Sequence, residues 1–277
     1  MKNLLTKQIS APRWTNGKIV DAAQRLMVQY ESIVGRDYIK KEGLHFDHFY
    51  ERVIFPKFNI SLYEDEDLGV DADGRKLLGR FDIRGNVAHL DQAISRESKD
   101  PRRIFTCWHE VAGHGVLQGE WLRNQLDPSS GCAFIDVTEY SLSPYDERIL
   151  ERQANLFASH LAAPGWLIKH AIEKIFRPNG PFVFKEPCNY WLDVQGLGTN
   201  GYVVDAGQLC QRIGSKISGH FGGLSAEAIG YRIAELGWVR DLSKRDLHLR
   251  RASRRDGAYA KPGNMFQATV SGCLSVE

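Results

Sequence analysis

The sequence predicts a mainly helical α+β protein with a small sheet and a helical C-terminal part. Apolar residues recur at helical spacing in 16–34, 102–122 and 146–162. Apolar and polar residues instead alternate in 77–83 and 87–91, which is typical of strands. The 277 residues are 43% hydrophobic and 25% charged, an ordinary mixture for a soluble globular protein. This composition excludes fibrous and largely disordered proteins.

The N-terminal part, residues 1–45, is predicted to be a helical segment. It holds the helix over 16–34, whose apolar side chains lie near one face. A second helix is expected over 43–52, with Pro56 interrupting it. The stretch NISLYE over 59–64 is expected to be a short strand.

Residues 46–175 are expected to form a catalytic domain around a hairpin and two long helices. The tripeptide Arg84-Gly85-Asn86 separates the two alternating runs and favours a tight turn between them. The first long helix covers 102–122. Asp146 opens the second helix, which ends at Ala163-Pro164-Gly165 because proline and glycine stop helices.

The C-terminal half is predicted to contain a loop-rich lobe over 176–205 and a helical region with a basic tail over 206–277. Two short helices over 208–220 and 226–236, joined around Gly222-Gly223-Leu224, outline a helix-turn-helix, and the basic residues of 244–255 would then contact DNA phosphates. The alternative is a packed helix pair with a solvated tail. The sequence favours this alternative, because Ala, Glu and Ala open the helix over 226–236 where base-reading side chains would be needed.

Charge and cysteine content restrict the possible partners. The 36 basic and 34 acidic residues leave a net charge of +2, which argues against a dedicated polyanion binder. The five cysteines form no CxxC pair, so neither a disulfide framework nor a thiolate zinc site is expected. We find no secretory signal and no apolar run long enough to cross a membrane, so we expect a cytoplasmic protein without a membrane partner.

The motif that carries chemistry is His109-Glu110-Val111-Ala112-Gly113-His114. Two imidazoles and a carboxylate on one helix are the components of a zinc hydrolase, in which the histidines bind the metal and the glutamate accepts a proton from water. The histidines are five positions apart and would diverge by about 140° on an ideal α-helix. A π-turn brings them onto one face, and Gly113 tolerates the distortion. We therefore predict a π-turn here and a zinc ion (Zn2+) as cofactor.

A second motif, Glu151-Arg-Gln-Ala-Asn-Leu-Phe-Ala158, lies on the next long helix, and Phe105-Thr106 precedes the His-Glu pair. Together these residues resemble the ImmA/IrrE metallopeptidase family, whose pattern is FT-x-x-HE-x-x-H followed by E-x-x-A-N-x-F-A. The resemblance covers residues 102–165 and implies a zincin-like fold. It also implies that Glu151 is the third zinc ligand beside His109 and His114. The chain departs from the family by the extra residue between its histidines; dipeptidyl-peptidase III has the same HExxGH spacing.

Other side chains near these motifs are candidates for further roles. Glu110 would be the general base and then the proton donor to the leaving amine. Glu147, one turn before the third ligand, is either a partner that orients an imidazole or a solvated charge. Asn155 either orients a ligand or fixes its helix to a loop. Tyr140 and Tyr145 are both candidates to stabilise an oxyanion, and the spacing selects neither.

By resemblance, the protein is expected to be a zinc metallopeptidase that cleaves another intracellular protein. In the family this substrate is typically a DNA-binding transcriptional repressor. The hairpin over 77–91 would offer an edge strand to an extended peptide. The alternative is a non-catalytic regulatory, DNA-binding or interaction protein with a degenerate or structural zinc site. The histidine spacing supports that alternative, whereas Glu110 opposes it because a structural site needs no general base.

Overall fold

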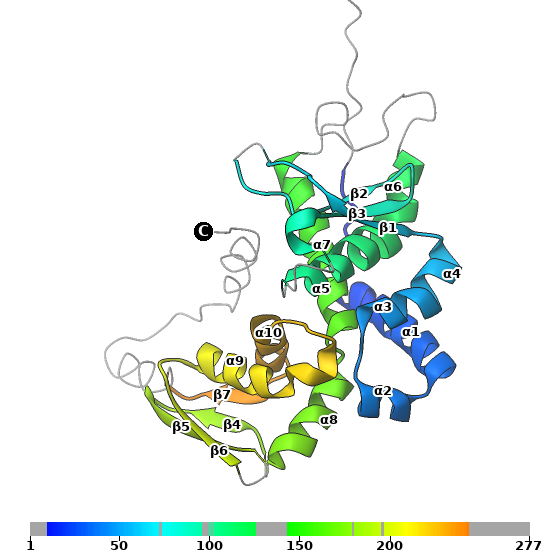
Figure 1. Ribbon diagram of the computed structural model, residues 1–277. Coiled ribbons are helices and arrows are strands. Elements are labelled where there is room, and N and C mark those ends of the chain that lie inside the picture. Colours follow the sequence, from blue (N-terminus) through cyan, green and yellow to red (C-terminus); the bar gives the residue numbers. More distant parts are fainter. Residues whose placement is uncertain are drawn as a thin grey trace, which may run out of the picture. The chain divides into compact units, whose positions relative to one another are not determined.

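The chain folds into two units. The computed structural model describes residues 10–71, 74–95, 100, 102–125, 143–178, 180–194 and 197–243. The first unit comprises Met1–Leu68, Leu78–Ile168 and Ser218–Ser225, and the second comprises Gly69–Leu77, Lys169–Ile217 and Ala226–Glu277. The predicted α+β class, mainly helical with a small sheet, is confirmed (Figure 1). Among the described residues, none of the helices combines the length and the apolar character that a membrane span requires.

A three-stranded sheet in the first unit has the order β1-β3-β2. Strand β1 (Ser61–Glu66) runs parallel to β3 (Val87–Asp91), and β2 (Gly79–Asp82) pairs antiparallel with β3. Asn86 takes a left-handed conformation, with φ of 56°, in the turn between β2 and β3. The predicted hairpin is therefore confirmed, and β2 lies at one edge of this sheet.

The first long helix is continuous but not uniform. It consists of α5 (Arg102–Cys107), the π-helical segment η4 (Trp108–Gln118) and α6 (Gly119–Gln125). The buried indole of Trp108 anchors it, because the rings of Phe46 and Phe49 pack against it edge-on. Strands β2 and β3 contact η4, so the sheet lies directly against the segment that carries the HExxGH motif.

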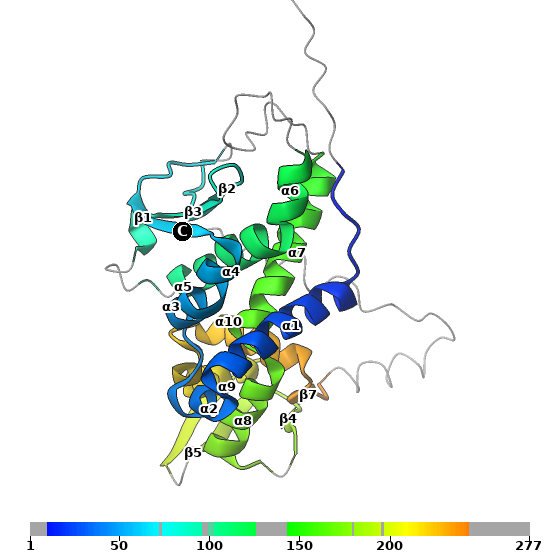
Figure 2. The same cartoon turned by 90° about the vertical axis from the view of Figure 1, so that its right-hand side faces the viewer.

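The second long helix, α7 (Pro144–Ala162), packs against η4. It begins two residues before the predicted start, because the Ser143 hydroxyl caps it by accepting from the backbone N–H of Asp146. Its end at Ala163 matches the prediction. Helix α1 (Asn16–Val34), which also has its predicted bounds, crosses α7 (Figure 2).

One expectation for the N-terminal part is wrong. The segment predicted as a helix interrupted at Pro56 continues through that residue, because proline is tolerated in the first turn of a helix. The helical stretch ends instead at Asn59, whose φ of 49° is left-handed. The short helical elements of this unit are α2 (Arg36–Glu42), α3 (Phe46–Phe49), η1 (Tyr50–Ile54), α4 (Phe55–Phe58), η2 (Gln92–Ile94) and η5 (Ser218–Phe221).

The second unit combines strands with a helix pair. The prediction of a loop-rich lobe over 176–205 missed three strands there. Strand β4 (Phe182–Phe184) pairs in parallel with β7 (Val239–Asp241), and β5 (Cys188–Val194) forms an antiparallel hairpin with β6 (Leu197–Val203). Helix α8 (Gly165–Phe176) starts in the first unit and continues into the second.

Helices α9 (Ala206–Ile217) and α10 (Ala226–Glu235) pack closely on each other. Glycines make this approach possible: a Cβ atom at Gly214 would lie 2.5 Å from the carbonyl oxygen of Ala226, and one at Gly230 would lie 3.0 Å from the amide nitrogen of Gln211. Tight packing of this pair is expected under both interpretations of the region, the helix-turn-helix and the packed helix pair. The basic tail over 244–255 lies outside the described residues.

Candidate metal centre

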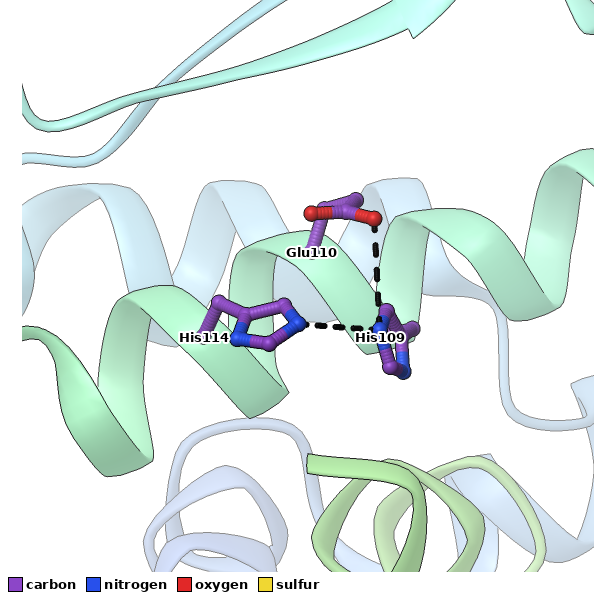
Figure 3. Close-up of side chains that lie close together, drawn as sticks. All are labelled: His109, Glu110 and His114. Carbon is purple, nitrogen blue, oxygen red and sulfur yellow. Dashed lines mark hydrogen bonds and ion pairs between the residues drawn. The ribbon is translucent and has the colours of Figure 1, made fainter. Parts of the chain in front are cut away.

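Both histidines of the HExxGH motif face each other on one side of η4 (Figure 3). Their rings are nearly perpendicular, with centroids 4.6 Å apart, and the two Nε2 atoms are 3.0 Å apart. The predicted π geometry is confirmed and extends further than one turn, over all 11 residues of η4. The wider helix compensates for the extra residue, so a five-residue spacing brings both imidazoles together.

Gly113, the residue that lengthens the motif, lies where η4 touches α7. A Cβ atom on Gly113 would be 2.8 Å from the Cβ of Ala154 and 2.9 Å from its Cα and carbonyl oxygen. Gly113 does not have a positive φ, so the requirement for glycine that the structure adds here is a steric one. The small residues Gly113 and Ala154 let the two motif-bearing helices approach closely.

The Glu151 carboxylate of α7 completes a triangle with the two imidazoles. Its Oε2 atom is 3.3 Å from His109 Nε2, and its Oε1 atom is 3.3 Å from His114 Nε2. With zinc–ligand distances of about 2.0–2.2 Å, tetrahedral ligand atoms lie about 3.3–3.5 Å from each other. The three side chains therefore have the chemistry and approximately the spacing of a zinc site.

The Glu110 carboxylate lies beside the same nitrogen atoms but further away. Its Oε1 atom is 4.0 Å from His109 Nε2, and the side chain is buried. His109, Glu110 and His114 offer ligand atoms within 4.8 Å of one another, so this group is able to hold a metal ion. Because the oxygens of Glu151 lie closer to both imidazoles, the geometry favours Glu151 over Glu110 as the third ligand.

Each imidazole is oriented through its other nitrogen. The Nδ1 atom of His109 donates to Oδ1 of Asn155, and Nδ1 of His114 donates to Oε1 of Gln118, both over 3.0 Å. Of the two alternatives left open for Asn155, this contact with His109 favours the orienting one. The sequence reasoning missed Gln118, although its position one helical turn after His114 is a signal that would have found it.

Burial and neighbouring charges shift the pKa values of three side chains in the site. Burial alone would lower the pKa of His114, but the Glu151 carboxylate, with smaller effects from Glu110 and Gln118, raises it to about 9. Burial opposes ionisation of Glu151, yet the two histidines hold its pKa well below the usual range. Burial raises the pKa of Glu110. A metal ion that binds His114 must therefore compete with a proton for its imidazole.

The remaining candidates lie elsewhere. Glu147 is exposed, and the Nδ1 atoms of both imidazoles are engaged by Asn155 and Gln118, so Glu147 corresponds to the solvated helix charge rather than to an orienting partner. Tyr145 is 59% exposed, with the guanidinium of Arg13 over its ring. Tyr140 lies outside the described residues.

Comparison of the sequence with models of protein families and with curated proteins gives no match. The functional assignment therefore depends on the residues of the site and on their arrangement.

Proposed function

We propose that the protein is a zinc-dependent metallopeptidase with a zincin-like catalytic unit, of the kind that the resemblance to the ImmA/IrrE family implies. The observation that carries this proposal is the convergence of His109, His114 and Glu151. Their ligand atoms lie 3.0–3.3 Å apart, from two helices that meet through Gly113. A structural zinc site would need four protein ligands and no base, whereas this set offers three with a buried carboxylate beside them.

The proposed mechanism uses Glu110 as the group that moves protons. A bound zinc ion supplies Lewis-acid polarisation and lowers the pKa of its water to about 7. The Glu110 carboxylate accepts the proton of the attacking water and then donates it to the leaving amine. Burial supports this role, because a raised carboxyl pKa brings the two protonation states closer in energy near neutral pH.

Strand β2 is the proposed docking edge for the substrate. A Cβ atom at Gly79 would lie 2.6 Å from Cγ of Glu110 and 2.8 Å from its Oε1, so the β2 backbone passes directly against the base. Within its sheet, β2 pairs only with β3 among the described strands. An extended peptide that added to β2 as a further strand would bring its carbonyl groups past Glu110. We propose an exposed segment of an intracellular protein as substrate, with a DNA-binding repressor as the candidate that the family resemblance adds.

The substitution Glu110→Gln tests this function directly. The amide keeps the size of the side chain but cannot accept the proton, so we expect full zinc occupancy and loss of cleavage by about 100- to 10,000-fold. The wild type and the variant are each expressed in the same host cells. Proteins of the host that are newly cut are identified by mass spectrometry of their new termini. Glu147→Gln, an exposed glutamate of α7, is the matched control and should cleave like the wild type.

One result of the Glu110→Gln experiment would contradict the proposal. Identical sets of protein termini from the wild type and the Glu110→Gln variant, with zinc bound to both, would exclude the peptidase. The non-catalytic regulatory alternative would then account for the site.

A further inference from the structure

Gln118 is fully buried, with 0% of its surface exposed, at the end of η4. Its side chain makes two hydrogen bonds in opposite directions. Its Nε2 atom donates to the backbone carbonyl of Leu150 over 2.7 Å, and its Oε1 atom accepts from Nδ1 of His114 over 3.0 Å. A buried amide is thus held between a histidine of one helix and the backbone of another.

We infer that Gln118 is a positioning residue that selects the metal-binding form of His114 and ties it to the residue preceding Glu151. This inference rests on the proposed metal centre. The reasoning starts from the carbonyl of Leu150, which is only an acceptor and therefore binds the NH2 end of the amide. The Oε1 end must then face His114, so Nδ1 carries the proton. The lone pair of a neutral His114 is consequently on Nε2, the atom that lies against His109 and Glu151.

The same side chain links the two helices that supply the ligands. His114 belongs to η4, and Leu150 immediately precedes Glu151 on α7. The Gln118 amide therefore connects His114, one proposed ligand, to the backbone beside Glu151, another proposed ligand. Side chains that orient metal-bound histidines typically change metal affinity by about 10- to 100-fold when they are removed. Asn155 contacts the Nδ1 atom of His109 in the corresponding way.

The chain contains a closely matched control for Gln118. Gln153 on α7 is also buried, with 1% exposed, and its Nε2 atom donates to the backbone carbonyl of Pro12 over the same 2.7 Å. Its Oε1 atom has no hydrogen-bond partner among the described residues. Gln118 and Gln153 thus share burial and a donor bond to a carbonyl, and they differ in the bond to a histidine.

The test compares the zinc affinity of Gln118→Met and Gln153→Met in the full chain, by competition with a chromophoric chelator. We expect Gln118→Met to bind zinc about 10- to 100-fold more weakly than the wild type. Gln153→Met should keep the wild-type dissociation constant, even though it also loses a bond to a carbonyl. Urea unfolding of both metal-free variants shows that each is folded and compares their losses of stability.

A third variant separates the two bonds of Gln118. Gln118→Glu keeps the acceptor for His114 and loses the donor for Leu150. We expect its zinc affinity to lie closer to the wild type than that of Gln118→Met, while its unfolding midpoint drops as that of Gln118→Met does. Affinity restored by the acceptor alone is a result that a purely structural role for Gln118 would not produce.

The outcomes distinguish this inference from the function on which it rests. Equal zinc affinities for Gln118→Met and Gln153→Met, with tight binding by the wild type, would overturn the inference alone. A wild-type protein that binds no zinc would overturn both. A weakened Gln118→Met together with no effect of Glu110→Gln on any cleavage would uphold the positioning role and overturn the peptidase.

Discussion

At the scale of single residues, the space that the Glu110 side chain occupies depends on a glycine at position 79, which has no side chain of its own. Gly79 of β2 has no positive φ, so nothing in its backbone conformation requires glycine. What requires it is the proximity of Glu110 and Thr106, whose atoms would lie 2.6–2.8 Å from an added Cβ. Real Cβ atoms do not approach other heavy atoms so closely, so a side chain at this position must displace either the base or the strand.

This steric relation predicts the effect of Gly79→Ala. The methyl group should move the Glu110 carboxylate or the β2 edge by a fraction of an ångström or more, and cleavage should slow by on the order of 100-fold. Zinc content should not change, because the three atoms nearest to the added methyl group belong to Glu110 and Thr106 and not to a metal ligand. The rate is measured on a protein that the Glu110→Gln comparison identifies as cut.

A glycine without close neighbours provides the control. A Cβ atom at Gly17 of α1 would meet only the Thr15 hydroxyl, at 4.0 Å. Gly17→Ala should therefore leave cleavage unchanged. An equally active Gly79→Ala variant would show that β2 does not constrain the base.

At the scale of elements, α7 is held by the chain segment that precedes α1. The Asp146 carboxylate accepts from the backbone N–H of Ala11, from the guanidinium of Arg13 and from the hydroxyl of Ser143. Gln153 adds a bond from the same helix to the carbonyl of Pro12. The helix that carries Glu151 and Asn155 is thus fixed by an N-terminal segment that is distant in sequence.

Asp146 makes this attachment dependent on pH. The Ser143 hydroxyl, followed by the Ala11 amide and Arg13, holds the pKa of Asp146 below its ordinary value of 3.8. A carboxyl group whose pKa is lower in the folded state stabilises the protein above its unfolded pKa, and this contribution is lost as the pH falls through the folded pKa. Asp146→Asn should therefore lower the urea midpoint at neutral pH, and its difference from the wild type should shrink below pH 3.8.

The exposed Asp37 provides a comparison on the surface. Its pKa is also lowered, through Lys40, but its side chain is 95% exposed. Asp37→Asn should change the midpoint little at any pH, because solvent screens an exposed pair. A constant difference between Asp146→Asn and the wild type across the acid range would contradict the assigned role of Asp146.

At the scale of the whole molecule, the sequence predicted most of what is local. The 3.6-residue periodicity located α1 and α7, and alternation located β2 and β3, because each pattern reflects one element packing on the core. The five-residue spacing of His109 and His114 was sufficient to predict a π-turn. The predicted helix boundaries were wrong where a local signal was ambiguous. Pro56 is an example, because proline stops one helix but is equally suited to begin another.

The features that the sequence did not predict depend on distances between remote segments. Gly79 faces Glu110, Gly113 faces Ala154, and Gln118 reaches the carbonyl of Leu150. None of these contacts produces a repeating pattern in the sequence, because each joins only one pair of residues. The strands within 176–205 were missed for another reason: the glycine, proline and asparagine of that stretch suggested loops, while the backbone pairing of β5 and β6 accommodates the glycines and asparagines.

The central claim is that His109, His114 and Glu151 together bind zinc despite the lengthened histidine spacing. Metal analysis of the purified protein by mass spectrometry tests it most directly, using His114→Ala with the exposed His45→Ala as control. The wild type and His45→Ala should carry about one zinc ion per chain, and His114→Ala should lose it. Full zinc occupancy in His114→Ala would contradict the claim.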